Sequence, residues 1–174
     1  HPEKIQLLSE ALIHNSKCQA AMGHWVRVEP TLYFKNPRPD GYLIHASVSN
    51  LMFKLDVIRE QGGWDQVKVA ADSEMYERIK ILYGKQSIAE ILPGVPLVFA
   101  RDVPGSLTTT DTTHAFSEFF GLRQIYRAHY STWHNTFSSA PTPPVSVRPS
   151  HRLFPAPATN LVIAPPDKVY EVVL

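Results

Sequence analysis

Apolar residues recur every three or four positions in three segments, which is the pattern of a helix with one buried face. The first segment follows Pro2, a residue that suits the first turn of a helix, and ends near Asn15. The second covers residues 71–84 and the third covers residues 114–134, which are rich in aromatic side chains. A short apolar segment at 56–61, followed by two glycines, predicts one further helix.

Other segments alternate between apolar and polar residues, which is typical of β-strands. The alternation runs through residues 19–29 and again through residues 42–48, and residues 31–35 are a candidate short strand. Two apolar runs, at 87–92 and 95–101, flank a Pro-Gly turn. We therefore expect an α/β fold, in which helices flank a mixed sheet.

Length and charge exclude several classes of protein. The chain has 174 residues, 44% of them hydrophobic, which is enough for one domain with a core. Its formal net charge of +1 gives no electrostatic footprint for nucleic acid. The chain contains no apolar run near the roughly 18 residues that span a bilayer, so we expect no transmembrane segment. The single cysteine, Cys18, favours a reducing compartment. We expect the cytoplasm, with a peripheral position on a membrane as the alternative.

The prolines divide the chain into two parts. Eight of the 15 prolines lie between residues 140 and 166, which predicts extended, polyproline-like chain. We assign residues 1–138 to one domain and residues 139–174 to a proline-rich tail or linker. An alternative is a strap that packs back on the domain through its apolar side chains, which are Leu153, Phe154, Leu161 and Ile163. The chain begins at His1 without a signal peptide, as the middle of a longer protein would.

Several strong motifs are missing from the sequence. It has no P-loop, no G-x-G-x-x-G, no G-x-S-x-G and no H-E-x-x-H. No pair of cysteines is present to bind zinc, and the eight histidines are scattered. We therefore predict no metal site within this chain.

One stretch has an order of motifs that points to chemistry. An apolar strand at 49–54 leads to a short helix, then to Gly62-Gly63-Trp64-Asp65, and then to a helix start that reads Ala71-Asp72-Ser73-Glu74-Met75-Tyr76-Glu77-Arg78. This order resembles the C-terminal half of inverting nucleotide-sugar glycosyltransferases, of the large bacterial family that makes surface polysaccharides. Ala71 stands where that family has an acidic residue.

Both ends of the predicted domain extend the resemblance, which covers roughly residues 1–137. His1-Pro2-Glu3-Lys4-Ile5 looks like the helix start that follows the metal-binding Asp-x-Asp-type segment of the family. Pro104-Gly105-Ser106-Leu107-Thr108 is similar to the Ser-Leu-Thr segment after the last core strands of the family.

The resemblance implies the acceptor-side half of a glycosyltransferase-A-type domain, followed by the proline-rich tail. The parent enzyme would transfer a sugar from a nucleotide-sugar donor to a glycan acceptor. Its nucleotide-binding half, with the aspartates that hold Mg²⁺ or Mn²⁺, would lie before residue 1. We therefore expect this chain alone to hold no cation and to be poorly active or inactive. The rival hypothesis is a non-catalytic carbohydrate-binding or assembly domain.

Asp72 matches the position of the catalytic base in the family. A base takes the proton of the acceptor hydroxyl as that hydroxyl attacks the anomeric carbon. The alternative is that Asp72 only caps the helix. Glu74 lies two positions further on, and helical residues two apart do not face each other. This spacing argues against a pair of glycosidase carboxylates.

Four further residues are candidates for binding. Glu74 and Arg78 fall within the resemblance and are expected substrate contacts. The alternative for Glu74 is a charge in the first turn of the helix. The alternatives for Arg78 are a partner of a carboxylate or a surface residue. His45 and Ser47 lie on the polar side of a predicted strand, where they would contact the acceptor or simply face solvent. His114 follows the threonine-rich loop and is the candidate for contact with the diphosphate or its metal; an ordinary helix start is the alternative.

Overall fold

The computed structural model describes residues 1–34, 41–106, 121–139 and 152–162. These residues form a mixed α/β fold, and its helices and strands are α1 (Lys4–His14), β1 (Ala20–Met22), β2 (His24–Val28), β3 (Ile44–Ala46), β4 (Met52–Phe53), α2 (Leu55–Gln61), α3 (Ala71–Tyr83), β5 (Ile88–Glu90), β6 (Pro96–Arg101) and α4 (Leu122–Asn135). Short 3₁₀ turns lie among them, at η1 (Val48–Asn50), η2 (Lys85–Ser87), η4 (Thr136–Ser139) and η5 (Ala158–Asn160).

Two small mixed sheets share one nearly continuous strand. β1 lies between antiparallel β4 and parallel β5, and β2 lies between antiparallel β3 and parallel β6. Gly23 separates β1 from β2, and the register with β6 shifts between His24 and Trp25. A Cβ atom at Gly23 would lie 2.8 Å from Cδ1 of Leu97, so the close approach of the Leu97 side chain favours glycine here.

The structure confirms most of the predicted elements. The predicted strand at 19–29 is the pair β1 and β2, and the predicted helix at 71–84 is α3, which Gly84 follows with a φ of 92°. The predicted strand at 31–35 is reduced in its described part to one isolated antiparallel bridge, between Phe34 and Val28. The backbone turns before that bridge, because Leu32 has a φ of 68° and its N–H donates to the Glu29 carbonyl.

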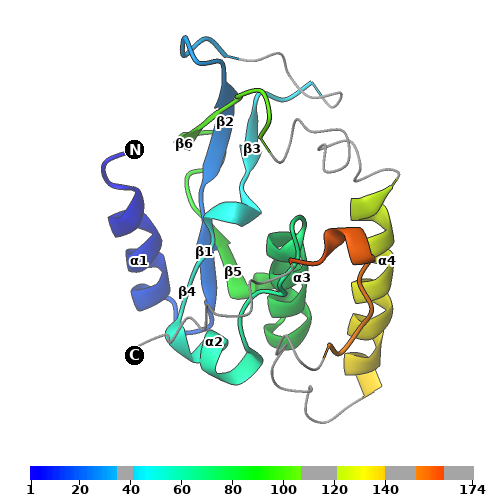
Figure 1. The fold of residues 1–174 in the computed structure, drawn as a ribbon. Coiled ribbons are helices and arrows are strands. Elements are labelled where there is room, and N and C mark those ends of the chain that lie inside the picture. Colours follow the sequence, from blue (N-terminus) through cyan, green and yellow to red (C-terminus); the bar gives the residue numbers. More distant parts are fainter. Residues whose placement is uncertain (35–40, 107–120, 140–151, 163–174) are drawn as a thin grey trace, which may run out of the picture.

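α3 lies between the sheet and α4 (Figure 1). One side of α3 places Met75 and Ile79 against Ala20 of β1 and Val57 of α2. α1 contacts β1 and β4 from the other side of the strands. The predicted third helix begins at Leu122 in the described chain, while residues 114–120 lie outside the described residues.

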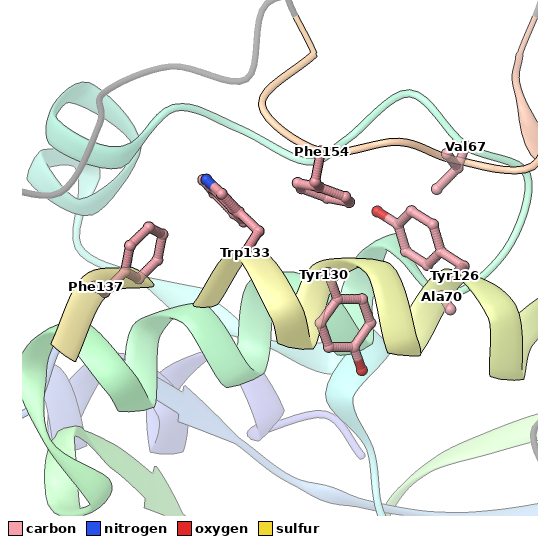
Figure 2. Close-up of a cluster of buried hydrophobic side chains, with 7 residues drawn as sticks. All are labelled: Val67, Ala70, Tyr126, Tyr130, Trp133, Phe137 and Phe154. Atoms are coloured by element: carbon pink, nitrogen blue, oxygen red, sulfur yellow. The ribbon is translucent and has the colours of Figure 1, made fainter. Parts of the chain in front are cut away.

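The proline-rich part contributes a segment to the core. Residues 152–162, which we name the strap, pack against α4, and Phe154 of the strap is 4% exposed. Figure 2 shows the Phe154 ring beside Trp133 and Tyr126; the Trp133 and Phe154 ring centroids are 4.8 Å apart. The alternative of a strap that packs back is confirmed for these residues, while Ile163 lies outside the described part.

Candidate functional site

Asp72 lies in the first turn of α3, and its side chain is half-buried. Its Oδ1 accepts a hydrogen bond from the Ser73 N–H at 2.9 Å. Only the short turn η2 separates α3 from β5, so α3 runs back along the sheet and its first turn lies toward the carboxyl ends of β1 and β5 (Figure 1). Binding sites of α/β sheets form at this edge, where the helix dipole also favours a charged carboxylate.

Glu74 lies in the interior, unlike Asp72, as expected for helical positions two apart. Its side chain is 0% exposed, and that of Arg78 is 2% exposed. Nε of Arg78 lies 3.0 Å from Oε1 of Glu74, and Nη2 donates to Oε2 at 3.1 Å. The alternative of Arg78 as the partner of a carboxylate is therefore confirmed. These contacts are with protein groups, and a direct substrate contact by either residue stays a prediction.

The same carboxylate joins α3 to α4. Nε2 of His134 lies 3.0 Å from Oε1 of Glu74, and the His134 side chain is 3% exposed. One buried carboxylate thus has two partner residues, Arg78 from its own helix and His134 from α4. A buried charge needs such partners, because burial removes it from water.

Arg78 also holds the turn that precedes α3. Its Nη1 donates to the Gln61 carbonyl at 2.5 Å, and its Nη2 donates to the Gly63 carbonyl at 2.9 Å. The end of α2 and the Gly-Gly turn are therefore bonded to the helix that carries Asp72. The two motifs that carry the resemblance form one hydrogen-bonded unit.

Asp65, the last residue of the Gly-Gly-Trp-Asp turn, is buried, with 4% exposure. Its Oδ2 accepts a hydrogen bond from the Tyr126 hydroxyl at 2.8 Å, and its Oδ1 accepts one from Nη1 of Arg152 at 2.8 Å. Nη2 of Arg152 donates to Oδ2 as well, which makes a two-pronged ion pair. Burial raises the pKa of the Tyr126 hydroxyl, and the adjacent Asp65 carboxylate raises it further, so the hydroxyl remains a donor.

The other predicted binding residues lie elsewhere in the fold. Ser47 is buried; its N–H donates to the Gly23 carbonyl at 3.1 Å, and its Oγ lies 3.1 Å from Oγ of Ser49. The turn η1 that follows Ser47 contacts α3, so this segment lies on the same side as the Asp72 helix. His45 is half-buried in β3, opposite Trp25 of β2. His114 lies outside the described residues.

One polar pair at the carboxyl edge of the sheet was not expected. Nε2 of His24, just after β1, lies 2.5 Å from Oε1 of Glu90, the last residue of β5. The Gly94 N–H donates to Nδ1 of His24 at 3.3 Å, so Nδ1 accepts and the ring proton lies on Nε2. The sequence pattern had placed His24 only on an apolar strand face, which matches its 8% exposure.

No protein-family model and no curated protein matches the sequence of this chain. Across the four described ranges, the structure contains no group of three or more His, Cys, Asp or Glu side chains that could hold a metal ion. The helices described here are also too short or too polar to cross a membrane.

Proposed function

We propose that residues 1–138 are the acceptor-side half of a glycosyltransferase-A-type domain, which transfers a sugar from a nucleotide-sugar donor to a glycan acceptor with inversion. One observation carries the proposal. The Gly-Gly-Trp-Asp turn and the acidic start of α3, which resemble consecutive motifs of that family, are bonded together through Arg78. Surface polysaccharide synthesis in the cytoplasm, or at the surface of a membrane, is the setting that goes with this proposal.

In the proposed reaction, Asp72 is the general base. Its carboxylate takes the proton of the acceptor hydroxyl while the hydroxyl oxygen bonds to the anomeric carbon. The bond from that carbon to the nucleoside diphosphate breaks on the opposite side, which inverts the configuration. Asp72 lies in the first turn of α3, at the positive end of the helix dipole. A divalent cation in the donor-binding half would supply charge stabilisation for the leaving diphosphate.

The test is Asp72→Asn in a polypeptide that also carries a donor-binding half, assayed with several nucleotide sugars and Mn²⁺. We expect kcat to fall about 100-fold or more, because the amide cannot accept the proton. Asp56→Asn is the matched control, since the Asp56 side chain is 74% exposed on α2 and should leave kcat unchanged. Near-normal turnover in Asp72→Asn would remove Asp72 as the base. Robust transfer by the 174-residue chain alone would overturn the half-domain assignment.

A second candidate is a non-catalytic carbohydrate-binding or assembly domain. Ala71 favours it, because an acidic residue stands at this position in the family that the sequence resembles. The two candidates differ in what the protein does with a bound glycan. Glycan binding with no transfer by any polypeptide that contains this chain would favour the second candidate.

A further inference from the structure

The segment between α2 and α3, residues 62–70, needs support from elsewhere in the fold. Its last residue, Ala70, has a φ of 68°, a left-handed conformation that a residue other than glycine adopts only when its surroundings enforce it. Its Asp65 carboxylate is buried and needs bonding partners. Arg78 bonds to the start of the segment, at the Gly63 carbonyl, and to the Gln61 carbonyl at the end of α2.

The strap supplies partners for the rest of the segment, residue after residue. Arg152 binds Asp65 with two N–H groups. The Asn160 side chain, which is fully buried, accepts a hydrogen bond from the Val69 N–H at 3.2 Å and donates one to the Val69 carbonyl at 3.3 Å. Backbone bonds lie between these two contacts, from the Lys68 N–H to the Asn160 carbonyl at 2.8 Å and from the Val162 N–H to the Gln66 carbonyl at 3.1 Å.

This support ends where α3 begins. Val69 precedes Ala70, and the Ala70 carbonyl accepts the Glu74 N–H at 3.0 Å, which closes the first turn of α3. Asp72 lies inside that turn. A shift of residues 65–69 would therefore release the left-handed Ala70 and change the direction in which the first turn presents Asp72.

We propose that Arg152 and Asn160 are positioning residues, through which the strap clamps residues 65–69 and fixes the orientation of the Asp72 carboxylate. The role given to Asp72 rests on the proposed function, whereas the clamp itself does not. The proline-rich part of the chain is then a component of the site and not only a linker. Arg152 and Asn160 lie about 90 residues away in sequence from the segment that they bind.

Amide hydrogen exchange on the 174-residue chain tests the clamp. In Arg152→Gln and in Asn160→Ala, we expect the amides of residues 66–73 to exchange at least tenfold faster, while those of α1 keep their rates. Arg152→Lys should regain part of the protection, because it restores the charge but not the two-pronged geometry. Arg59→Gln is the matched control, since Arg59 forms an exposed pair with Asp56 on α2. Unchanged exchange of residues 66–73 in both strap variants would overturn the clamp.

A second variant keeps this test decisive if Arg152→Gln loses its fold. Asp65→Asn combined with Arg152→Gln removes both charges, so that no buried carboxylate is left without its cation. We expect this double variant to fold and still to exchange residues 66–73 faster than the unchanged chain. Protection equal to that of the unchanged chain would overturn the role of the Arg152 ion pair.

Kinetics test the positioning role in a polypeptide that is active in sugar transfer. We expect kcat of Arg152→Gln to fall about tenfold with little change in KM for the donor, since only the acceptor-side base is displaced. Arg152→Lys should recover part of kcat, and Arg59→Gln should leave it unchanged. Faster exchange with an unaltered kcat would overturn the positioning role. Absence of transfer by the unchanged polypeptide would overturn the proposed function, and the exchange experiment would still decide the clamp.

Discussion

The two sides of α3 are packed by different kinds of contact. The side toward the sheet places Met75 and Ile79 against small aliphatic residues of β1 and α2. The side toward α4 combines the aromatic rings of Tyr126 and Trp133 with the buried Glu74, Arg78 and His134. Apolar burial is not directional, whereas a hydrogen-bonded ion pair has few geometries that satisfy its atoms. The sheet side therefore sets where α3 lies, and the α4 side sets how it is oriented.

The difference also predicts how each side responds to substitution. Removing a few atoms from an apolar contact lowers the free energy of unfolding in proportion to the buried area lost and the cavity left behind. Removing one member of a buried ion pair costs more, because its partner keeps a charge that water no longer reaches. The following substitutions test this contrast, from the largest expected effect to the smallest.

Glu74→Gln should have the largest effect on stability. Arg78 would keep its charge at 2% exposure with its carboxylate partner gone, and the free energy of unfolding should fall by about 3 kcal/mol. Urea unfolding followed by circular dichroism measures the change. The control is Glu77→Gln, since the Glu77 side chain is 43% exposed and pairs with Lys80 on the surface; its expected cost is below about 1 kcal/mol. Equal losses in the two variants would contradict the contrast.

Gly23→Ala tests apolar packing within the sheets themselves, at the junction of β1 and β2. The added Cβ would lie 2.8 Å from Cδ1 of Leu97, which is 1% exposed and has little room to move. We expect a loss of about 1 to 3 kcal/mol, measured as a lower melting temperature. Gly63→Ala is the matched control, because an added Cβ there meets no atom within 4 Å; its effect should be small. Equal melting temperatures for both variants would show that Leu97 moves aside at little cost.

The smallest expected effect is a loss of stability at alkaline pH. Burial, together with a hydrogen bond to Glu60, raises the pKa of Tyr83 to about 12 from its usual value of 10.0. Burial also raises the pKa of Tyr126 and of Tyr130. The unfolded chain loses these protons above pH 10, where the folded chain still holds them. The tyrosine contribution to stability should therefore be constant below about pH 9 and fall as the pH rises from 10 to 12.

Tyrosine variants assign this loss to one side of α3. Tyr83 packs beside the sheet-side cluster, and Tyr126 lies fully buried on the α4 side. The slope of the urea midpoint against pH should flatten more in Tyr126→Phe than in Tyr83→Phe, because Tyr126 is the more deeply buried. Tyr33→Phe is the control, since Tyr33 is 74% exposed. A slope unaffected by either buried tyrosine would contradict the assignment.

Local signals in the sequence were enough for most of the elements. The repeat of apolar residues and the glycine that follows each helix predicted α2 and α3 closely, because both signals act within one or two turns. The alternation in residues 19–29 predicted the long strand but not its division at Gly23. At that division Gly23 lies against Leu97, a neighbour more than 70 residues away in sequence. The turn at Leu32 was missed because a left-handed leucine leaves no mark on the pattern.

The candidate site was predicted in part. The sequence singled out Asp72, Glu74 and Arg78, and the structure places them on one helix start, with Glu74 and Arg78 in the interior. The partners that hold this helix start, His134 and Arg152, were not predicted, since they come from α4 and the strap. Pairing between residues 60 or 87 positions apart follows from the tertiary fold and not from any local spacing.

The ion pair between Asp65 and Arg152 also has a consequence for biosynthesis. The two residues are 87 positions apart, and a ribosome adds roughly 5 to 20 residues per second. Asp65 therefore leaves the ribosome roughly 4 to 17 s before its partner. During that interval the sheet side of α3 can form, while the aromatic rings of α4 lack Phe154. Until the strap is made and docks, the nascent chain leaves the α4 rings that Phe154 covers without this partner.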